Sequence, residues 1–512
     1  MKAEFVARTG RRLSRIKIGY VVAFFFLFYL AIGVTRHLLF HSGGWDLGIF
    51  DQTIWQYSHL QIAYNSVRGV SLLLADHFHP VLMSFAALYW IWSSPIMLIL
   101  AQAFLVAIAA FPIYRLAQRK LRNQSLALPI AFAYLGFWGI LAAVAFDFHP
   151  IVLVVPLLAF AYYFLETDRQ WAMLVMLALM LLVEEDAILM VIGFGIYLLA
   201  FRKKRRLGIA VCVVSAGWFV LVVSRIMPSL RPDSAGYAYW QHYSYIGPSM
   251  GSAALKLVTH PWLVIQYLFW PPGKLLTMFL LLLPFCFLPL LAPFSVVILP
   301  YFAERFLSDF PLHWSPYAHY NAAFSVVFAI AAIEALAWLE RRGRLSERAS
   351  PREPGRRFVL NPAHLATVFV IVALGAILLR GAWFAKENPL SSIETAESGY
   401  KVLAAIPADA FVVAQNAAVP HLSHRPDVYL YAGDYFRNEE SCKTDYELYK
   451  LYNERDIVSE ADYIVLNDRL DSFPLWPEEI TQAVECLKQD GRFICHDYGQ
   501  GWFLFERKPP PG

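Results

Sequence analysis

Two aspartates stand close together just after the first long apolar run, in the stretch Gly43–Gln52 (GGWDLGIFDQ). Asp46 and Asp51 are five positions apart, which is about 140° around a helix, so they need not share one face. Capping of a helix over Leu47–Tyr57 would explain Asp46 but would leave Asp51 without a role. Because membrane proteins seldom hold acids at a membrane boundary without a use for them, both are candidate catalytic carboxylates.

Two further clusters place aspartate and histidine directly before a proline: Asp76–Pro80 (DHFHP) and Asp147–Pro150 (DFHP). Each proline begins an apolar run, and proline is well tolerated in the first turn of a helix. Helix capping and interfacial anchoring explain each cluster alone, but the repetition at one membrane face favours a shared cavity wall. Aspartate and neutral histidine also suit a divalent cation such as Mg²⁺ or Mn²⁺, although no fixed ligand spacing supports one. The candidate cavity or metal residues here are Asp76, His77, His79, Asp147 and His149.

A third acidic group, Glu184 and Glu185 followed by Asp186, lies between two apolar runs. Each charge would cost about 2.5–3.5 kcal/mol at the centre of a bilayer, so the group must face water, a cavity or a cation. A simple hairpin tip at the membrane surface explains the same residues without any function. Glu184 and Glu185 are therefore further candidates for the cavity wall or a metal site.

The basic side chain that could contact a phosphate at this face is Arg305, with His313 and His319 nearby in sequence. A guanidinium group is a natural two-pronged donor to phosphate oxygens, and the histidines would add further donors. The alternatives are a snorkelling anchor or a local ion pair with the neighbouring Glu304. Carboxylates and a cation at one membrane face suggest chemistry on an anionic lipid head group, but they do not name the reaction.

The composition is that of a polytopic α-helical membrane protein. Of the 512 residues, 58% are hydrophobic and only 16% are charged, against roughly 25% charged residues in soluble domains. Basic residues before the first span, and the clusters 115–122, 202–206 and 341–357, predict a cytoplasmic amino terminus by the positive-inside rule. The short apolar run Pro80–Trp92 is predicted as an interfacial or re-entrant helix. About eleven transmembrane helices are predicted, near 18–40, 95–117, 126–146, 150–166, 171–184, 186–201, 207–226, 274–291, 292–306, 319–340 and 364–382.

These spans predict two domains. Residues 1–382 form an all-α transmembrane domain with a large first external loop over 41–94, and residues 383–512 form a soluble extracytoplasmic α/β domain. The tail shows helical periodicity over Ser391–Ile406 and Glu478–Lys488 and no glycine-rich phosphate loop. Its predicted strands are Phe411–Ala414, Asp427–Tyr431 and Asp462–Leu466, with a closing hairpin of Arg492–His496 and Trp502–Glu506.

The five cysteines form no CxxC pair, so their spacing indicates no metal site. Cys442, Cys486 and Cys495 belong to the tail and would face an oxidising compartment under the predicted topology. One disulfide among these three is possible, and the spacing does not select the pair.

Several motifs carry a resemblance to a bacterial membrane family known only as a domain of unknown function. The most specific is Trp45–Gln52 (WDLGIFDQ). The family is in turn similar to the GT-C glycosyltransferases, whose members use polyprenyl-phosphate sugars. The other motifs are Asp76–Pro80, Ser94–Pro95, Ala101–Ala103 and the tail segment Val419–Pro426 (VPHLSHRP).

The resemblance implies that an acid of the first external loop is the catalytic base or a metal-site residue. The matching positions are Asp46 and Asp51, whose spacing of five departs from the closer pairing usual in that superfamily. Either one would deprotonate an acceptor hydroxyl, so that the anomeric centre inverts. Arg305, with His313 or His319, would stabilise the phosphate of the leaving lipid.

The sequence therefore predicts a glycosyltransferase of the bacterial inner (cytoplasmic) membrane that uses a polyprenyl-phosphate-linked sugar donor. Its partners would be that donor, membrane lipid and an envelope acceptor of unknown identity, with no nucleic acid. One alternative is a transporter or flippase for a lipid-linked or anionic solute, in which the acids bind cations or protons. Another is a non-catalytic envelope assembly protein in which the tail is the working part.

Overall fold

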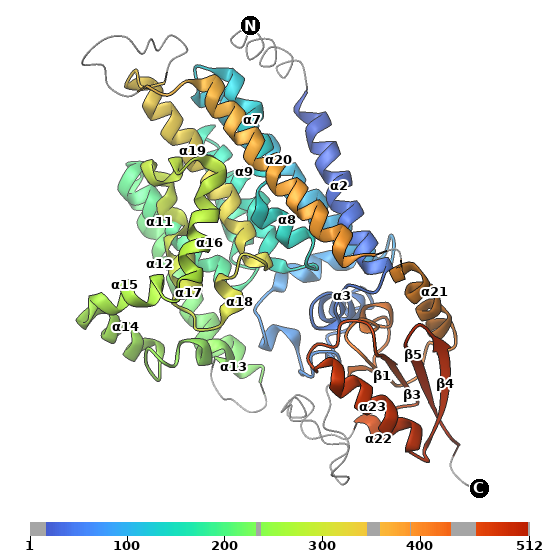
Figure 1. Ribbon diagram of the computed structural model, residues 1–512. Coiled ribbons are helices and arrows are strands. Elements are labelled where there is room, and N and C mark those ends of the chain that lie inside the picture. Colours follow the sequence, from blue (N-terminus) through green and yellow to red (C-terminus); the bar gives the residue numbers. More distant parts are fainter. Residues whose placement is uncertain (1–16, 232–236, 346–358, 390, 432–456, 510–512) are drawn as a thin grey trace, which may run out of the picture.

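The computed structural model describes residues 17–231, 237–345, 359–389, 391–431 and 457–509. Figure 1 shows a large bundle of helices and, at its lower right, a smaller tail that contains the sheet. Residues 41–94, predicted as the first external loop and called the first loop from here on, lie between these two parts. This arrangement confirms the predicted fold class in its coarse form, a helical membrane part followed by a small α/β tail.

The helices of the bundle follow the apolar runs of the sequence. They are α2 (Ile18–Leu38), α5 (Ile96–Ile108), α6 (Ala110–Lys120), α7 (Ala127–Leu135), α8 (Trp138–Val144), α9 (Val154–Glu166), α10 (Gln170–Met180), α11 (Glu185–Phe201), α12 (Arg205–Leu221), α13 (Met227–Ser229), α14 (Met250–Thr259), α15 (Pro261–Phe269), α16 (Gly273–Leu282), α17 (Leu299–Leu307), α18 (Pro311–Trp314), α19 (Ala322–Arg341) and α20 (Pro362–Glu387). Helix α19 is apolar on nearly every side, so it lies at the centre and packs against α6, α7, α8 and α9. Helices α2 and α20 are much less buried and lie at the outside of the bundle (Figure 1), as helices that face lipid would.

The predicted count of eleven spans is not confirmed. Among the described residues, five helices are long and apolar enough to cross a membrane, or up to seven if two bent pairs each form one span. The two spans predicted at 274–291 and 292–306 are instead the short helices α16 and α17, joined by the 3₁₀ turns η8 (Leu283–Phe285), η9 (Leu288–Leu291) and η10 (Pro293–Ile298). Pro284, Pro289 and Pro293 interrupt this stretch, and proline both removes a backbone donor and clashes with the preceding helical turn. The chain is still a multi-pass membrane protein.

The first loop folds into short helical pieces. They are the π-helical turn η1 (Gly44–Gly48), α3 (Ile49–Ser58), η2 (Leu73–Ala75), η3 (Pro80–Phe85) and α4 (Ala86–Tyr89). The helix predicted over Leu47–Tyr57 is therefore α3, entered through a π turn, a geometry that often marks functional positions. Asp46 lies inside this turn, and no side chain caps either η1 or α3. The capping interpretation of Asp46 is wrong.

Two glycines of the π turn allow the tail to pack against the loop. A Cβ on Gly44 would lie 2.5 Å from the Cβ of Val419, and one on Gly48 would lie 2.9 Å from its Cγ1. Such approaches are closer than packed atoms allow, so only glycine lets η12 (Val419–His421) of the tail rest on η1. The Gly44 N–H also donates to the carbonyl oxygen of Asn416 at 2.8 Å. The loop and tail motifs that carry the family resemblance thus touch in space.

The described part of the tail forms a five-stranded sheet in the order β2-β1-β3-β5-β4. Its elements are α21 (Ser391–Ala404), β1 (Val412–Ala414), β2 (Val428–Leu430), α22 (Ile457–Glu460), β3 (Tyr463–Asn467), α23 (Pro477–Gln489), β4 (Phe493–Gly499) and β5 (Trp502–Arg507). Strand β1 runs parallel to both neighbours, so that Val413 pairs with Tyr429 on one side and with Ile464 on the other. Strands β3, β5 and β4 are antiparallel. The helices, strands and hairpin predicted for the tail are all present, with ends shifted by a few residues.

One cysteine of the tail is disulfide-bonded. This is Cys486 in α23, whereas Cys495 in β4 is free, as are Cys212 and Cys286 in the bundle. Cys442 lies outside the described residues. The single tail disulfide that the sequence allowed therefore exists and does not include Cys495.

Candidate active site

A cavity of about 710 Å³ lies where the bundle, the first loop and the tail meet. This volume is in the range of ligand pockets. Ten of the twelve candidate residues line the cavity, and the two that do not are Asp51 and Glu185. The ten are Asp46, Asp76, His77, His79, Asp147, His149, Glu184, Arg305, His313 and His319.

Asp46 enters the cavity from the π turn and is held by His149. Its Oδ1 lies 3.1 Å from His149 Nε2, and His149 Nδ1 lies 3.3 Å from the carbonyl oxygen of Asp147. Both ring nitrogens of His149 thus face oxygen atoms. Both contacts are hydrogen bonds if each ring nitrogen carries a proton, or if Nδ1 carries one and the Asp46 carboxyl carries the other. The ring of His319 stacks on that of His149, with centroids 3.5 Å apart. The carboxylate is therefore fixed in orientation by a histidine that is itself fixed.

Asp147 stands behind the same turn. Its Oδ2 accepts the N–H of Gly43 at 2.7 Å, at the start of the turn that carries Asp46. Burial raises the pKa of Asp147 to about 8, with Arg36 opposing the shift and Asp46 adding to it. The carboxyl is thus largely protonated at neutral pH and can donate a hydrogen bond as well as accept one.

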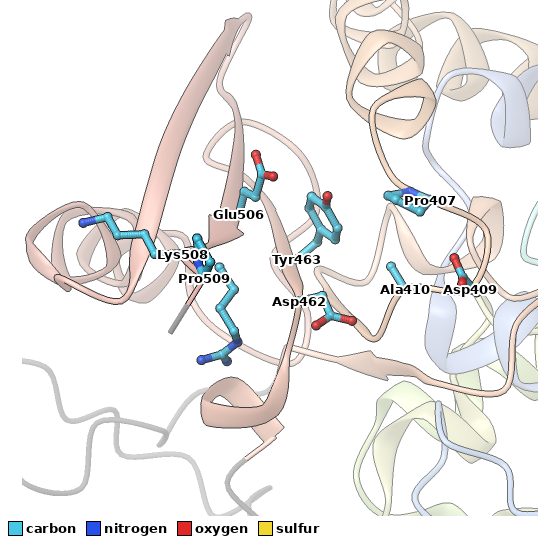
Figure 2. A pocket seen from close by; sticks show the side chains of 9 residues that line it. Pro407, Asp409, Ala410, Asp462, Tyr463, Glu506, Lys508 and Pro509 are labelled. Carbon is cyan, nitrogen blue, oxygen red and sulfur yellow. The ribbon is translucent and has the colours of Figure 1, made fainter. Parts of the chain in front are cut away.

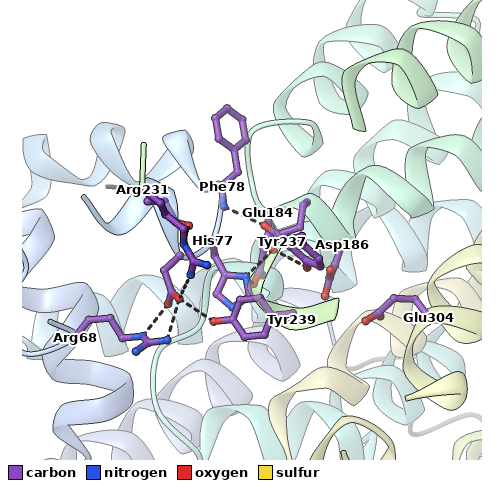
Figure 3. A network of polar contacts seen from close by, with 12 residues as sticks. Arg68, His77, Phe78, Glu184, Asp186, Arg231, Tyr237, Tyr239 and Glu304 are labelled. Atoms are coloured by element: carbon purple, nitrogen blue, oxygen red, sulfur yellow. Dashed lines mark hydrogen bonds and ion pairs between the residues drawn. The ribbon is translucent and has the colours of Figure 1, made fainter. Parts of the chain in front are cut away.

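Another part of the cavity wall is a network of polar contacts in which Asp76 joins Arg68 and Tyr239 (Figure 3). Arg68 donates from Nε and Nη2 to both carboxylate oxygens at 2.9 Å, and the Tyr239 hydroxyl donates to Oδ1 at 3.1 Å. Burial raises the pKa of Asp76, but Arg68 and His77 lower it by more, to a net value of about 2. This carboxylate is fully occupied by its own neighbours.

His77 continues the network. Its Nδ1 lies 2.8 Å from Glu185 Oε1 and 3.4 Å from Glu184 Oε1, and its ring stacks on Tyr239 with centroids 4.3 Å apart. Burial lowers the pKa of His77, but Glu185 and Glu184 raise it by more, to about 10. Glu185 also accepts the N–H of Phe78 at 3.0 Å. Glu185 therefore supports the wall from behind, which explains why it does not line the cavity.

Arg305 is buried at 3% exposure and is already paired. It forms ion pairs with Asp186 and with Glu304, the latter at 3.1 Å. Its guanidinium lies 4.0 Å above the ring centroid of Tyr320 and 5.0 Å from that of Tyr301. The local pair with Glu304 that the sequence suggested is present, and a snorkelling anchor is excluded by the burial. Stacking and pairing together hold the guanidinium at a fixed place in the wall.

Two histidines of the wall, His79 and His319, have buried ring nitrogens without a hydrogen-bond partner. Neither ring nitrogen of His79 has a hydrogen-bond partner, nor does Nδ1 of His319. His313 uses Nδ1 for a contact of 2.9 Å with Ser308 Oγ. Burial lowers the pKa of His79 to about 4, so its ring is neutral. Buried polar atoms without partners are rare in native proteins, so these histidines are suited to contact polar groups of a ligand.

Asp51 lies outside the cavity, contrary to its place beside Asp46 in the prediction. It is fully buried between the first loop and the tail, where Tyr89 and Ser423 donate to it. His424 Nε2 lies 3.0 Å from its Oδ2. Asp51 therefore fastens the tail to α3 and has no access to a substrate in the cavity.

The donor set does not fit a resident metal ion. Among the described residues, no group of three or more histidine, cysteine, aspartate or glutamate side chains could hold one. The acids that the sequence offered are engaged elsewhere: Asp76 with Arg68, and Glu185 with His77.

Several lining residues were missed by the sequence interpretation. The aromatic run Tyr237–Tyr245 supplies part of the wall, and its density of tyrosine and histidine was a usable signal. The tail contributes Asn416, Asp471 and Phe473. No local sequence pattern indicates these three residues, because they reach the cavity only when the tail docks against the bundle.

A second cavity, of about 430 Å³, lies in the tail (Figure 2). It is formed near the amino-terminal ends of β1 and β3, by residues that include Asp409, Asp462 and Glu506. Part of its charge is used internally, because Asp462 accepts the N–H of Phe411 at 2.9 Å and Arg507 donates to backbone carbonyls. None of the predicted site residues lines it.

Comparison with solved structures finds the same fold in ArnT from Cupriavidus metallidurans. The crystal structure of ArnT bound to undecaprenyl phosphate has a TM-score of 0.52 and 11% sequence identity, over 96% of this chain and 98% of that one. The apo structure gives a TM-score of 0.48 and 12% identity, over 95% of this chain and 97% of that one. Comparison with curated protein sequences gives no match.

A family model described as predicted membrane protein (DUF2079) matches residues 36–504, nearly the whole chain. The fold likeness to ArnT agrees with the GT-C-like fold that the family resemblance implies. The chain belongs to the DUF2079 family of predicted membrane proteins, and its fold is GT-C-like.

Proposed function

We propose that the protein is an integral-membrane glycosyltransferase that moves a sugar from a polyprenyl-phosphate donor to an acceptor of the cell envelope, with inversion. The observation that carries the proposal is one cavity that holds a histidine-bound carboxylate, Asp46, and a buried guanidinium, Arg305. The fold likeness to a protein bound to undecaprenyl phosphate supports the choice of donor.

Asp46 is the proposed general base. The contact with His149 keeps the Asp46 carboxylate oriented until an acceptor hydroxyl arrives. Asp46 takes the hydroxyl proton while the acceptor oxygen forms a bond to the anomeric carbon. The bond from that carbon to the phosphate oxygen breaks on the opposite face, and polyprenyl phosphate leaves with the electron pair. The anomeric centre therefore inverts.

The proposed phosphate site lies at Arg305, with His313 and His319. His319 stacks on His149 on one side, and its ring centroid lies 4.0 Å from that of Tyr320, over which Arg305 sits. Contacts therefore run without a break from the base to the guanidinium. A guanidinium has five N–H donors, so a phosphate can replace one carboxylate partner while the other remains. The charge that develops on the leaving phosphate is then stabilised in place.

We further propose that the tail and the cavity face the outside of a bacterial inner membrane. The bonded Cys486 supports this orientation, because disulfides persist in oxidising compartments. Two of the basic clusters meet at one end of the bundle, since Lys120 and Arg202 both pair with Glu166. In Figure 1 the ends of α19 and α20 that flank the basic 341–357 segment lie far from the tail. That end is the proposed cytoplasmic side.

Labelling of single cysteines in intact cells tests the orientation. In a background without the free cysteines, Trp476→Cys in the exposed tail should react with an impermeant maleimide. Lys203→Cys, in the loop between α11 and α12, should react only after the membrane is opened. The reverse pattern would overturn the orientation.

The test of function is transfer of labelled sugar in membranes that contain the protein. The donors are undecaprenyl phosphates carrying a hexose, a pentose or an N-acetylhexosamine. Asp46→Asn keeps the shape and hydrogen bonding of the side chain but cannot accept the proton, so turnover should fall by about 10²–10⁴-fold while undecaprenyl phosphate still binds.

Asp51→Asn is the matched control, because it makes the same chemical change outside the cavity. Its turnover per folded molecule should stay close to that of the wild type. A transporter would instead move labelled solute across the membrane without forming a new glycosidic bond. Wild-type turnover in Asp46→Asn would show that the catalytic assignment is wrong.

A further inference from the structure

The tail also lines the active-site cavity, through loops at the carboxyl ends of the two parallel strands β1 and β3. Asn416 follows β1, and Asp471 lies in the loop that follows β3. The two loops are joined, because Asn416 Nδ2 donates to Asp471 Oδ2 at 3.0 Å and Gln415 Nε2 donates to the Asp471 carbonyl at 2.8 Å. The crevice between them is therefore a built feature of the tail.

The topology of the sheet makes this crevice a preferred place for a ligand. Strand β1 has β2 on one side and β3 on the other, all three parallel. The chain order therefore reverses at β1. In open α/β sheets, ligands bind outside the carboxyl ends of the strands at such a switch point. The tail cavity of Figure 2 lies at the opposite, amino-terminal ends of the same strands.

An aromatic surface lies beside the crevice. Phe473, two positions after Asp471, lines the active-site cavity with 45% of its surface exposed. Its ring meets Trp45 edge to face, with centroids 6.1 Å apart, and Arg68 lies 4.7 Å from the Trp45 ring centroid. The cavity mouth thus combines an exposed apolar ring with a carboxylate and an amide.

This surface is tied directly to the proposed base. Asn416 Oδ1 accepts the N–H of Trp45 at 3.0 Å, and the Asn416 carbonyl accepts the N–H of Gly44. Trp45 is the residue before Asp46. A molecule that rests on Phe473 and hydrogen-bonds to Asp471 is therefore held at a defined position relative to the Asp46 carboxylate.

We propose that Phe473, Asp471 and Asn416 form the acceptor subsite and that the acceptor is a carbohydrate. This inference rests on the proposed function and names the substrate class at the same site. A sugar ring has an apolar C–H face that packs on an aromatic ring, and hydroxyls that donate to a carboxylate and exchange hydrogen bonds with an amide. A polyprenyl chain has no hydroxyls for Asp471, and a phosphate would be repelled by Asp471 and Asp46. A carbohydrate fits all three side chains.

Saturation-transfer difference NMR on the full-length protein in detergent tests the subsite. The probes are the methyl glycosides of glucose, galactose, mannose and N-acetylglucosamine. At least one should receive saturation mainly on the ring C–H protons of one face. Phe473→Ala should weaken its apparent affinity about tenfold by removing the aromatic contact. Asp471→Asn should weaken it less, because an amide still accepts hydrogen bonds.

Trp476→Ala is the matched control, since this tail residue is a 71% exposed aromatic that does not line the cavity. It should bind the probe as the wild type does. The proposal is overturned if no glycoside gains saturation, if Phe473→Ala binds like the wild type, or if Trp476→Ala loses binding equally. It is also overturned if Phe473→Ala instead weakens binding of undecaprenyl phosphate, because the occupant is then the lipid.

Asp46→Asn separates this inference from the proposed function. The subsite does not use that carboxylate for affinity, so Asp46→Asn should bind the glycoside. Binding by both forms without any sugar transfer would refute the glycosyltransferase and leave the carbohydrate subsite standing. Transfer that depends on Asp46 but is unaffected by Phe473→Ala would refute the subsite alone.

Discussion

Two parts of the cavity wall differ in the partners of their carboxyl groups. We call one the paired wall and the other the open end. In the paired wall, every carboxylate has a cationic partner within 3 Å, as for Asp76 with Arg68 and Glu185 with His77. At the open end, Asp147 accepts a backbone N–H and Asp471 accepts an amide. The paired wall consists of Arg68, Asp76, His77, Glu185 and Tyr239, and the open end of Asp46, Asp147, His149, Asn416 and Asp471.

This difference suggests different roles for the two parts, a structural one for the paired wall and a ligand-binding one for the open end. A buried ion pair with good geometry satisfies its own charges, so it leaves little for a ligand to gain. In the open end, Asp46 contacts a histidine, His149, while Asp147 and Asp471 accept N–H groups from neutral partners. Carboxyl groups gathered in this way are unfavourable for folding, and such arrangements are found at functional sites. The open end is therefore the side where an acceptor should bind and lose its proton, while the paired wall holds the shape.

The largest effect should come from breaking the paired wall. Asp76→Ala leaves the Arg68 guanidinium without its two carboxylate bonds, and removing one partner of a buried pair is expected to destabilise by about 3–5 kcal/mol. The measurement is unfolding of the purified protein in detergent. Asp471→Ala, a carboxylate removed from the exposed loop of the open end, should change stability by no more than about 0.5 kcal/mol.

Replacing both partners, as in Arg68→Met with Asp76→Leu, should recover much of the loss, because neither member of the close pair is then left unpaired, and Arg231, which also faces Asp76, is 3.8 Å away. If Asp76→Ala and Asp471→Ala lower the free energy of unfolding equally little, the paired wall and the open end do not differ in their contribution to stability.

The second effect is a pH dependence of the paired wall. The pKa of His77 rises from its ordinary 6.5 to about 10 in the fold. The protonated ring therefore adds stability that is complete below pH 6.5 and disappears as the pH rises through 10. The difference in Tm between the wild type and His77→Gln should be largest near pH 6 and should vanish by about pH 10. A difference that does not change with pH would mean that the pair with Glu185 holds no proton.

The third effect concerns how close packing at a glycine keeps the shape of the open end. Gly44→Ala would drive a Cβ into Val419, whose side chain is branched and buried, so the tail or the turn must shift. Overpacking of this kind typically costs about 1–3 kcal/mol. The unfolding temperature and the turnover should both fall, because Asp46 belongs to the same turn. Gly19→Ala is the control, since nothing lies within 4 Å of its added Cβ.

Much of the cavity wall followed from the sequence. The clusters that contain Asp46, His77 and His149 could be assigned to one membrane face because basic residues mark the other face. A shared face is enough to bring short loops together around one cavity. Strands and helices of the tail were equally readable, because buried strands such as Tyr463–Asn467 are uninterrupted apolar runs between turn residues.

What could not be read depends on contacts between distant parts of the chain. Asp51 resembles Asp46 in every local respect, but its partner Ser423 is 372 positions away, and that contact removes it from the cavity. Asn416 and Phe473 reach the cavity only through docking of the tail. The predicted number of spans is not confirmed for a different reason. Hydropathy measures the length of an apolar run, whereas prolines decide whether that run is one continuous helix.

The last predicted effect has the opposite sign, because the substitution removes a buried carboxyl from the open end and should stabilise the fold. Folding raises the pKa of Asp147 from 3.8 to about 8. Between these values the folded chain keeps a proton that the unfolded chain releases, so stability falls as the pH rises from about 4 to 8 and is level above. Asp147→Asn stays neutral and can still accept the Gly43 N–H with its amide oxygen. Its Tm should match the wild type near pH 4 and exceed it increasingly up to pH 8, by about 2 °C or more. A Tm difference that is flat or negative across this range would show that the carboxyl ionises freely in the fold. The open end would then carry no strain that a substrate could relieve.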